Sequence, residues 1–175
     1  MIQDEVREKI RGWFTGRLPE GWTPAEITVD REEITVRLTT PDVTVAEGAS
    51  AAEVAEARAG RATAFREETR EARMAIAREA EHRYDRKVSW GVRVGEGEDV
   101  HGELWTHLAT PTMTRLRQPQ RLVLDTLVDA GVARSRADAL AWCVRLVGQH
   151  EEDWLAELQD ATRHVADVRA KGPAA

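Results

Sequence analysis

Residues 112–150 read TMTRLRQPQRLVLDTLVDAGVARSRADALAWCVRLVGQH, and this stretch decides how the chain is organised. A helical run of apolar residues stops at Gly131, a residue that tolerates the positive φ at which many helices end. Ser135 then opens a second helical pattern with Asp138 three residues later, an arrangement that satisfies free amides at a helix start. Residues 112–117 precede both helices as a short polar and apolar segment. We predict a short strand, a helix, a tight turn and a second helix.

The helical spacing continues beyond this stretch. Trp154, Leu158, Val165 and Val168 keep to helical intervals almost to the end of the chain. The pattern indicates that the last helix is extended. The extension has two open interpretations: a separate helix that serves dimerisation, or a helix that packs on the N-terminal domain.

The first hundred residues show a different succession of elements. The spacing of apolar residues, the turn residues and a helix start at Ser50 predict both helices and strands. These are a helix over 2–14, a hairpin of strands at 27–29 and 34–38, a long helix over 50–84, and strands over 88–94 and 101–108. The predicted fold class is therefore α+β. A helix, hairpin, long helix and strand domain (residues 1–109) is followed by a C-terminal helical module (residues 110–175).

The C-terminal module resembles the ribbon-helix-helix family of DNA-binding regulators over residues 112–148. Arg115-Leu116 stands where the strand of that family ends in Arg-Leu. Leu-Val-Asp-Ala-Gly at 127–131 is similar to the end of its first helix, and Ala-Arg-Ser-Arg-Ala-Asp-Ala-Leu at 133–140 is similar to its serine-led second helix. The resemblance covers about a quarter of the chain and does not extend to the first hundred residues.

The resemblance implies a homodimer that binds DNA. In this family two chains pair their short strands into an antiparallel ribbon, which enters the major groove and presents alternate side chains to base edges. With Leu116 pointing inward, the residues facing the bases are Met113, Arg115 and Arg117. The residues expected to contact phosphates are Arg121, Ser135 and Arg136.

The register of the strand has an alternative. Thr112 and Thr114 fall where the family usually has apolar inward residues. Because side chains alternate along a strand, a slip of one residue would exchange the two faces. The sequence leaves both registers open.

The charge is unevenly distributed. The whole chain has a formal charge of -6, while residues 110–150 hold six arginines and three aspartates, a net +3, which leaves -9 for the rest. A basic module on an acidic body favours a sequence-specific transcriptional regulator or a nucleoid-associated protein. The alternative is a structural or interaction protein that uses the same helices only to dimerise, because a fold does not fix a function.

The sequence does not favour an enzyme, and we expect no cofactor. It lacks a phosphate-binding loop with lysine, a nucleophile elbow, a His-Glu-x-x-His motif and paired cysteines. His101, Glu103 and His107 would share one face of the last predicted strand and are weak metal-ligand candidates, although Trp105 on that face favours packing. A KH-type RNA-binding domain is a further alternative for the N-terminal elements, but its Gly-x-x-Gly loop is missing.

The remaining expectations concern the N-terminal domain and the cell compartment. We interpret the six tryptophans and Cys143 as packing residues, and the alternating charges over 66–73 as a solvated helix face. The N-terminal domain is expected to serve oligomerisation or to sense a small-molecule or protein effector. No apolar run is long enough for a membrane helix and the first residues are acidic, so we expect a cytoplasmic protein without a membrane partner.

Overall fold

The computed structural model describes residues 4–95, 100–106 and 108–171, and the chain divides into two compact units, residues 1–111 and 112–175. The class is α+β, with a four-stranded sheet and six helices in the described residues. Unit 1 holds α1 (Asp4–Arg17), β1 (Thr23–Val29), β2 (Glu33–Thr40), α2 (Ala51–Glu68), α3 (Arg70–Tyr84), β3 (Lys87–Val94) and β4 (His101–Leu104). Unit 2 holds α4 (Gln118–Asp129), α5 (Arg136–His150) and α6 (Glu152–Lys171).

The sheet has the order β1-β2-β3-β4. Strands β1 and β2 form the predicted antiparallel hairpin, whose turn is held by Asp30: its carboxylate accepts bonds from the backbone N–H groups of Glu32 at 2.9 Å and Glu33 at 2.6 Å. Strands β2 and β3 are parallel, because the chain crosses between them through α2 and α3. Strand β4 pairs antiparallel with β3 and is shorter than the predicted 101–108.

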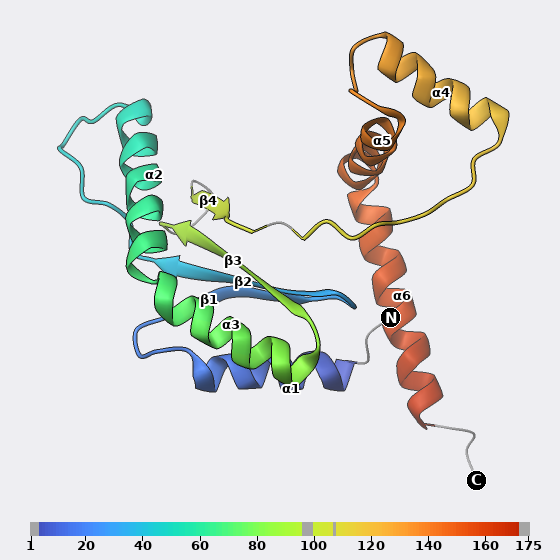
Figure 1. The fold of residues 1–175 in the computed structure, drawn as a ribbon. Helices are drawn as coiled ribbons and strands as arrows, with labels where there is room; N and C mark the ends of the chain where they lie inside the picture. The colour runs from blue at the N-terminus through green and yellow to red at the C-terminus, as the bar shows by residue number, and fades with distance from the viewer. Residues whose placement is uncertain (1–3, 96–99, 107, 172–175) are drawn as a thin grey trace. The chain divides into compact units, whose positions relative to one another are not determined.

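The core of unit 1 lies between one face of the sheet and its helices. Burial alternates along β2, with Ile34, Val36 and Leu38 fully buried, and α1 and α3 run along the same side of the sheet (Figure 1). Helix α1 contributes Ile10 and Phe14, both completely buried. This alternation follows from the period of two along a strand, which places every second side chain against the helices.

The long helix predicted over 50–84 is two helices. They meet at Thr69, whose backbone has φ -95° and ψ -1° and whose hydroxyl donates to the carbonyl of Phe65 at 2.5 Å. A threonine hydroxyl that bonds the carbonyl four residues earlier bends a helix. The directions of α2 and α3 accordingly differ (Figure 1). The apolar spacing continues across Thr69, so the periodicity alone did not reveal the break.

Arg73 is an exception to the predicted solvated face. It is buried, and its guanidinium donates to the Thr69 hydroxyl at 3.0 Å and to the carbonyl of Arg66 at 2.7 Å, near the end of α2. It also lies 4.5 Å from the ring centroid of Trp105. Burial, followed by repulsion from Arg66 and Arg70, lowers the pKa of Arg73 to about 10. Arg73 therefore stays charged at neutral pH and ties the junction of α2 and α3 to the end of β4.

An ion pair joins the loop after β2 to α2, and it lowers the pKa of the acidic partner. Arg58 donates to both carboxylate oxygens of Asp42, at 2.8 and 2.7 Å. These bonds and the backbone N–H of Val43 lower the pKa of Asp42 from 3.8 to about 2. Because the folded pKa is depressed, the stabilisation is complete above about pH 4 and is lost as the pH falls towards 2.

We expect a carboxyl ¹³C titration of Asp42 to show a midpoint near 2 in the parent protein. In Arg58→Ala the midpoint should move up towards 3.8, because the main donor is removed. Arg61→Ala is the matched control, since Arg61 is on the same helix and pairs with Glu68 instead. A parent midpoint near 3.8 would show that the Arg58–Asp42 pair does not persist in solution.

None of the helices in the described part of the chain is long and apolar enough to cross a membrane.

Candidate DNA-binding surface

Unit 2 is built around a very small core. Leu124 of α4, Ala133 of the turn and Ala139 of α5 are its buried residues. Five further side chains pack against them while partly exposed: Leu116, Leu127, Val128, Leu140 and Cys143. A core of this size removes little apolar surface from water, and unit 2 has correspondingly little hydrophobic stabilisation of its own.

The turn and helix start predicted from the sequence are present. Gly131 has φ +74°, and the N–H of Val132 bonds back to the carbonyl of Leu127 at 2.9 Å, which closes the end of α4. Ser135 caps α5 by accepting a bond from the N–H of Asp138 at 3.2 Å. The two helices and their connector are thus specified by local capping residues.

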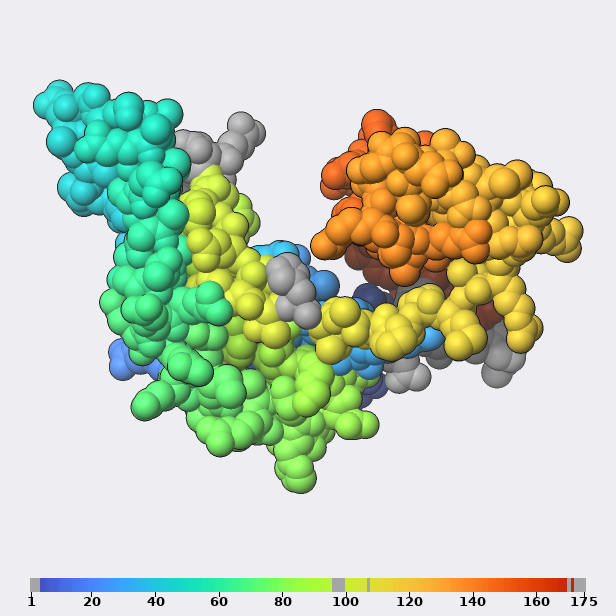
Figure 2. Space-filling model, turned by 45° about the horizontal axis from the view of Figure 1, so that its top comes forward, coloured from blue at the N-terminus to red at the C-terminus, as the bar shows by residue number. Residues whose placement is uncertain are grey.

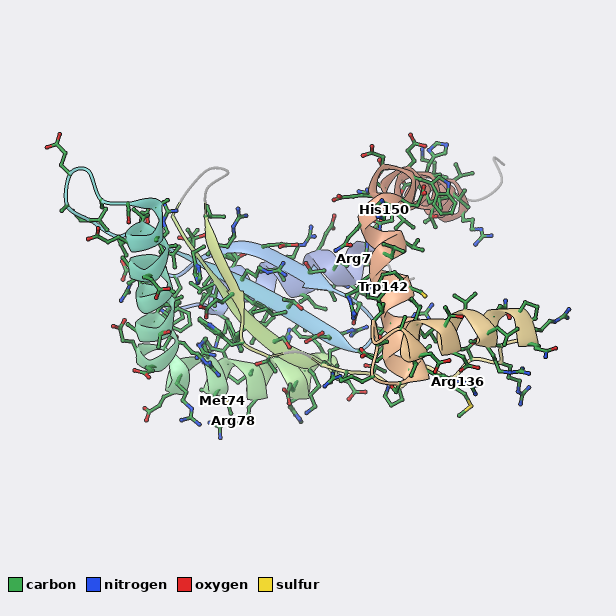
Figure 3. The ribbon with its side chains drawn as sticks, turned by 90° about the horizontal axis from the view of Figure 1, so that it is seen from above. Arg7, Met74, Arg78, Arg136, Trp142 and His150 are labelled. Carbon is green, nitrogen blue, oxygen red and sulfur yellow. The ribbon has the colours of Figure 1, made fainter. Side chains whose placement is uncertain are left out.

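A charged pair joins α4 to α5. Arg136 donates from two guanidinium nitrogens to the carboxylate of Asp125, at 2.6 and 2.7 Å, and this pairing lowers the pKa of Asp125. Arg136 lies at the start of α5, beside α4 (Figure 3). The pair is separated by eleven residues across a turn, so it could not be predicted from helical spacing.

The segment 112–117 is extended and exposed. It forms no β-ladder hydrogen bonds with the described residues of unit 2. It leads to α4 as an irregular segment, which is the yellow stretch in Figure 2. Met113 is 95% exposed, and Arg115 and Arg117 are exposed as well. Leu116 alone in this segment is half-buried, against the core of unit 2. Leu116 therefore faces inward, while the two arginines that flank it are accessible.

The three residues predicted to contact phosphates surround the two helix starts, and each already makes a bond within the unit. Arg121 donates to the carbonyl of Leu116 at 2.8 Å, Ser135 caps α5, and Arg136 holds Asp125. A guanidinium has five N–H donors, so these bonds leave both arginines with further donor capacity. Asp138, whose carboxylate accepts from the N–H of Arg134 at 3.0 Å, competes with an incoming anion at the start of α5.

Unit 2 exposes many large apolar side chains. The interpretation of every tryptophan as a packing residue is wrong for Trp154, which is 54% exposed. The other large apolar residues exposed in this unit are Met113, Leu122, Val123, Val132, Val144, Val147, Leu158, Val165 and Val168. Large apolar side chains that gather on one face of an element can form a contact surface for another molecule.

The metal-ligand candidates do not form a site in the described residues. The His101 ring nitrogen Nε2 lies 2.9 Å from one oxygen of Glu103, and the indole N–H of Trp105 donates to the other oxygen at 3.0 Å. The carboxylate is thus already occupied, and the His101 bond is the largest cause of its lowered pKa. His107 lies outside the described residues. Among those that are described, no group of three histidine, cysteine, aspartate or glutamate side chains is placed to hold a metal ion.

Each of the two units is matched by a model of a known protein family. The family model described as Rv1265-like protein, N-terminal domain, matches residues 8–100, more than half of the chain. The chain belongs to the Rv1265-like family. A second family model, the Mb1296 C-terminal domain, matches residues 117–169. The boundary between the two units falls between these matches.

Similar proteins are found in two mycobacteria. Mb1296 of Mycobacterium bovis and Rv1265 of Mycobacterium tuberculosis are each 59% identical to this chain over 163 residues, which is 92% of this chain and 69% of theirs. No solved structure matches the chain. Membership of the Rv1265-like family therefore rests on sequence similarity across both units.

Proposed function

We propose that this protein is a homodimeric, sequence-specific DNA-binding protein, a transcriptional regulator or a nucleoid-associated protein, that reads DNA through residues 112–117. The observation that carries the proposal is the state of this segment. It is extended and unpaired within its own unit, its Leu116 is anchored on the core, and two arginines beside Leu116 are exposed.

A second copy of the chain completes the proposed surface. Two backbone groups of this segment already have partners: the carbonyl of Leu116 accepts from Arg121, and the N–H of Arg117 donates to the side chain of Gln120. The other backbone N–H and C=O groups have no ladder partner in unit 2, and antiparallel pairing with the same segment of another chain would satisfy them. The resulting two-stranded ribbon fits the width of the major groove. Arg115 and Arg117 would then face the bases together with Met113, and arginine can donate two bonds to a single guanine.

Phosphate contacts would fix the ribbon in the groove. The start of α5 presents backbone N–H groups and the positive end of a helix dipole, next to Ser135 and Arg136. Arg121 lies at the start of α4, where its bond to the carbonyl of Leu116 keeps the guanidinium beside the ribbon segment. These contacts set orientation and affinity, whereas the ribbon supplies the sequence preference.

Unit 1 has a separate role in this proposal, which is oligomerisation or the sensing of an effector. A shallow depression of about 610 Å³ opens at one end of its sheet, where it is lined by Thr23, Thr39, Arg93 and Gly95, among other residues. Its lining mixes polar groups, among them Arg93 and the threonines, with apolar ones such as Ala25 and Pro41, so it does not favour a polar effector over an apolar one. We assign no cofactor and no enzymatic activity to either unit.

The ion pair between Arg136 and Asp125, together with the negative net charge, favours a second candidate function. Arg136, which should meet phosphate, is held by Asp125, and the whole chain carries a formal charge of -6. Both features suit a protein that keeps the helices only to dimerise and acts in structure or interaction. The first candidate ranks higher because exposed arginines flank Leu116, whereas a purely dimerising ribbon does not require positive charge on its outer face.

A mobility-shift titration of genomic fragments at several salt concentrations separates the two candidates. A dimer that contacts phosphate through Arg121 and the start of α5 in each protomer should neutralise about four phosphates. The logarithm of its binding constant should then fall with the logarithm of salt at a slope of about -3.6. The dimerising protein would give no shift even at about 50 mM salt, which would refute the first candidate.

A further inference from the structure

Helix α6 has an apolar seam that the other described residues of unit 2 do not cover. Trp154, Leu158, Ala161, Val165 and Val168 follow one another at steps of four, three, four and three residues. Their large side chains are 44–54% exposed, and no residue of α6 belongs to the core of unit 2. Leu155 is the one described side chain of this helix that is half-buried.

The spacing is that of a helix that pairs with another helix. Steps of four and three keep the five residues within a stripe narrower than a quarter of the helix circumference, the seam of a two-stranded coiled coil. At 1.5 Å per residue the seam runs for about 21 Å. Most of the stability of a helix in a protein comes from packing of its apolar face, so the seam is suited to a partner.

The charges of α6 indicate which partner and which direction. The first half holds Glu152, Asp153, Glu157 and Asp160 without a basic residue, and the second half holds Arg163, Arg169 and Lys171 with one acid, Asp167. Two parallel copies would place like charges side by side at both ends. Two antiparallel copies place each acidic half against a basic half, so the helix is complementary to its own reverse.

We infer that α6 pairs antiparallel with α6 of a second copy of this chain, through the seam formed by Trp154, Leu158, Ala161, Val165 and Val168. The contact is isologous, with the same face used by both protomers about a two-fold axis. Trp154 of each copy lies towards the C-terminal half of the other helix, which covers its exposed ring. This interface is separate from the ribbon segment and does not depend on DNA binding.

Distances between spin labels test the pairing and its direction. Labels are attached to Thr162→Cys, near the middle of α6, or to Asp153→Cys, near its start, each in a Cys143→Ser background of the full chain. An antiparallel pair gives a short distance between the two labels at 162, and a distance at least about 15 Å longer between those at 153. Equal distances at both positions would show a parallel pair, and the absence of a defined distance would show no pair. Either result overturns the inference.

A second measurement tests the seam itself. Leu158→Glu places a carboxylate on the seam, and Gln159→Glu places the same group one residue later, off the seam. We expect sedimentation equilibrium to show a dimer dissociation constant at least tenfold higher for Leu158→Glu than for Gln159→Glu. Equal dissociation constants would overturn the inference, because they would mean that the seam contributes nothing to the dimer. If α6 packs on unit 1 of its own chain, Leu158→Glu would instead lower the thermal stability of a monomer, and the inference would also fail.

These outcomes are distinct from those of the DNA proposal. Label distances and dimer dissociation are measured without DNA, and a protein that never binds DNA can still pair through α6. Conversely, a DNA-binding protein in which α6 remains unpaired would keep the first proposal and lose this one.

Discussion

Arg115→Ala is expected to lose at least about 30-fold in affinity for its DNA site while remaining a dimer. A bidentate contact between arginine and guanine is worth about 1–3 kcal/mol, and a homodimer loses two of them, one in each strand of the ribbon. The dimer should survive because the Arg115 side chain is exposed and contributes nothing to the core around Leu124. A quantitative mobility shift measures the affinity, and sedimentation verifies the dimer.

The control variant also removes one arginine, but from a position to which no DNA contact is assigned. Arg31 is exposed in the turn between β1 and β2, and Arg31→Ala should bind DNA within about twofold of the parent. The comparison separates a specific contact from a general loss of positive charge. If Arg115→Ala binds as the parent does, the ribbon assignment is wrong, even if the protein binds DNA by another surface.

Phe14→Ala is expected to be the most damaging single substitution in unit 1, with a loss of about 3–5 kcal/mol in the free energy of unfolding. Phe14 is completely buried between α1 and the sheet, and its ring makes edge contacts with Trp13 at 4.9 Å and with Trp90 at 6.1 Å. Domains of this size are stable by only about 5–15 kcal/mol, so the loss is a large part of the total. Urea unfolding followed by tryptophan fluorescence measures it.

Met74→Ala is the matched control for stability. Met74 is on α3, is 53% exposed and points away from the sheet (Figure 3). Its removal should change the free energy of unfolding by less than about 0.5 kcal/mol. A loss in Phe14→Ala no larger than that in Met74→Ala would show that α1 does not pack on the sheet as described.

Several elements were predictable because each depends on neighbours in the sequence. The hairpin of β1 and β2 follows from two apolar runs around Asp30, which fixes the turn by bonds to residues two and three positions later. Gly131 and Ser135 set the end of α4 and the start of α5 through their own backbone and side-chain bonds. In each case the interactions span only a few residues, so their pattern is visible in one dimension.

The features that were not predicted depend on residues brought together by folding. Thr69 divides the expected long helix, and the turn it makes buries Arg73, a residue that the mixed charges around it had placed in solvent. For the proposed site, the sequence indicated which arginines flank Leu116. It did not reveal the Arg136–Asp125 pair, which reduces the charge available for phosphate.

By itself, the sequence determined the α+β class, the hairpin and the capped helices of unit 2. It also determined that two arginines flank Leu116 within residues 112–117. Its periodicities report which side of an element is apolar, and its turn and cap residues report where the element ends. Only the tertiary structure decided which groups Arg73 and Arg136 bind, and that the other described residues of unit 2 leave the seam of α6 exposed. Those outcomes depend on contacts between distant residues, because a side chain is buried or exposed according to what packs against its element.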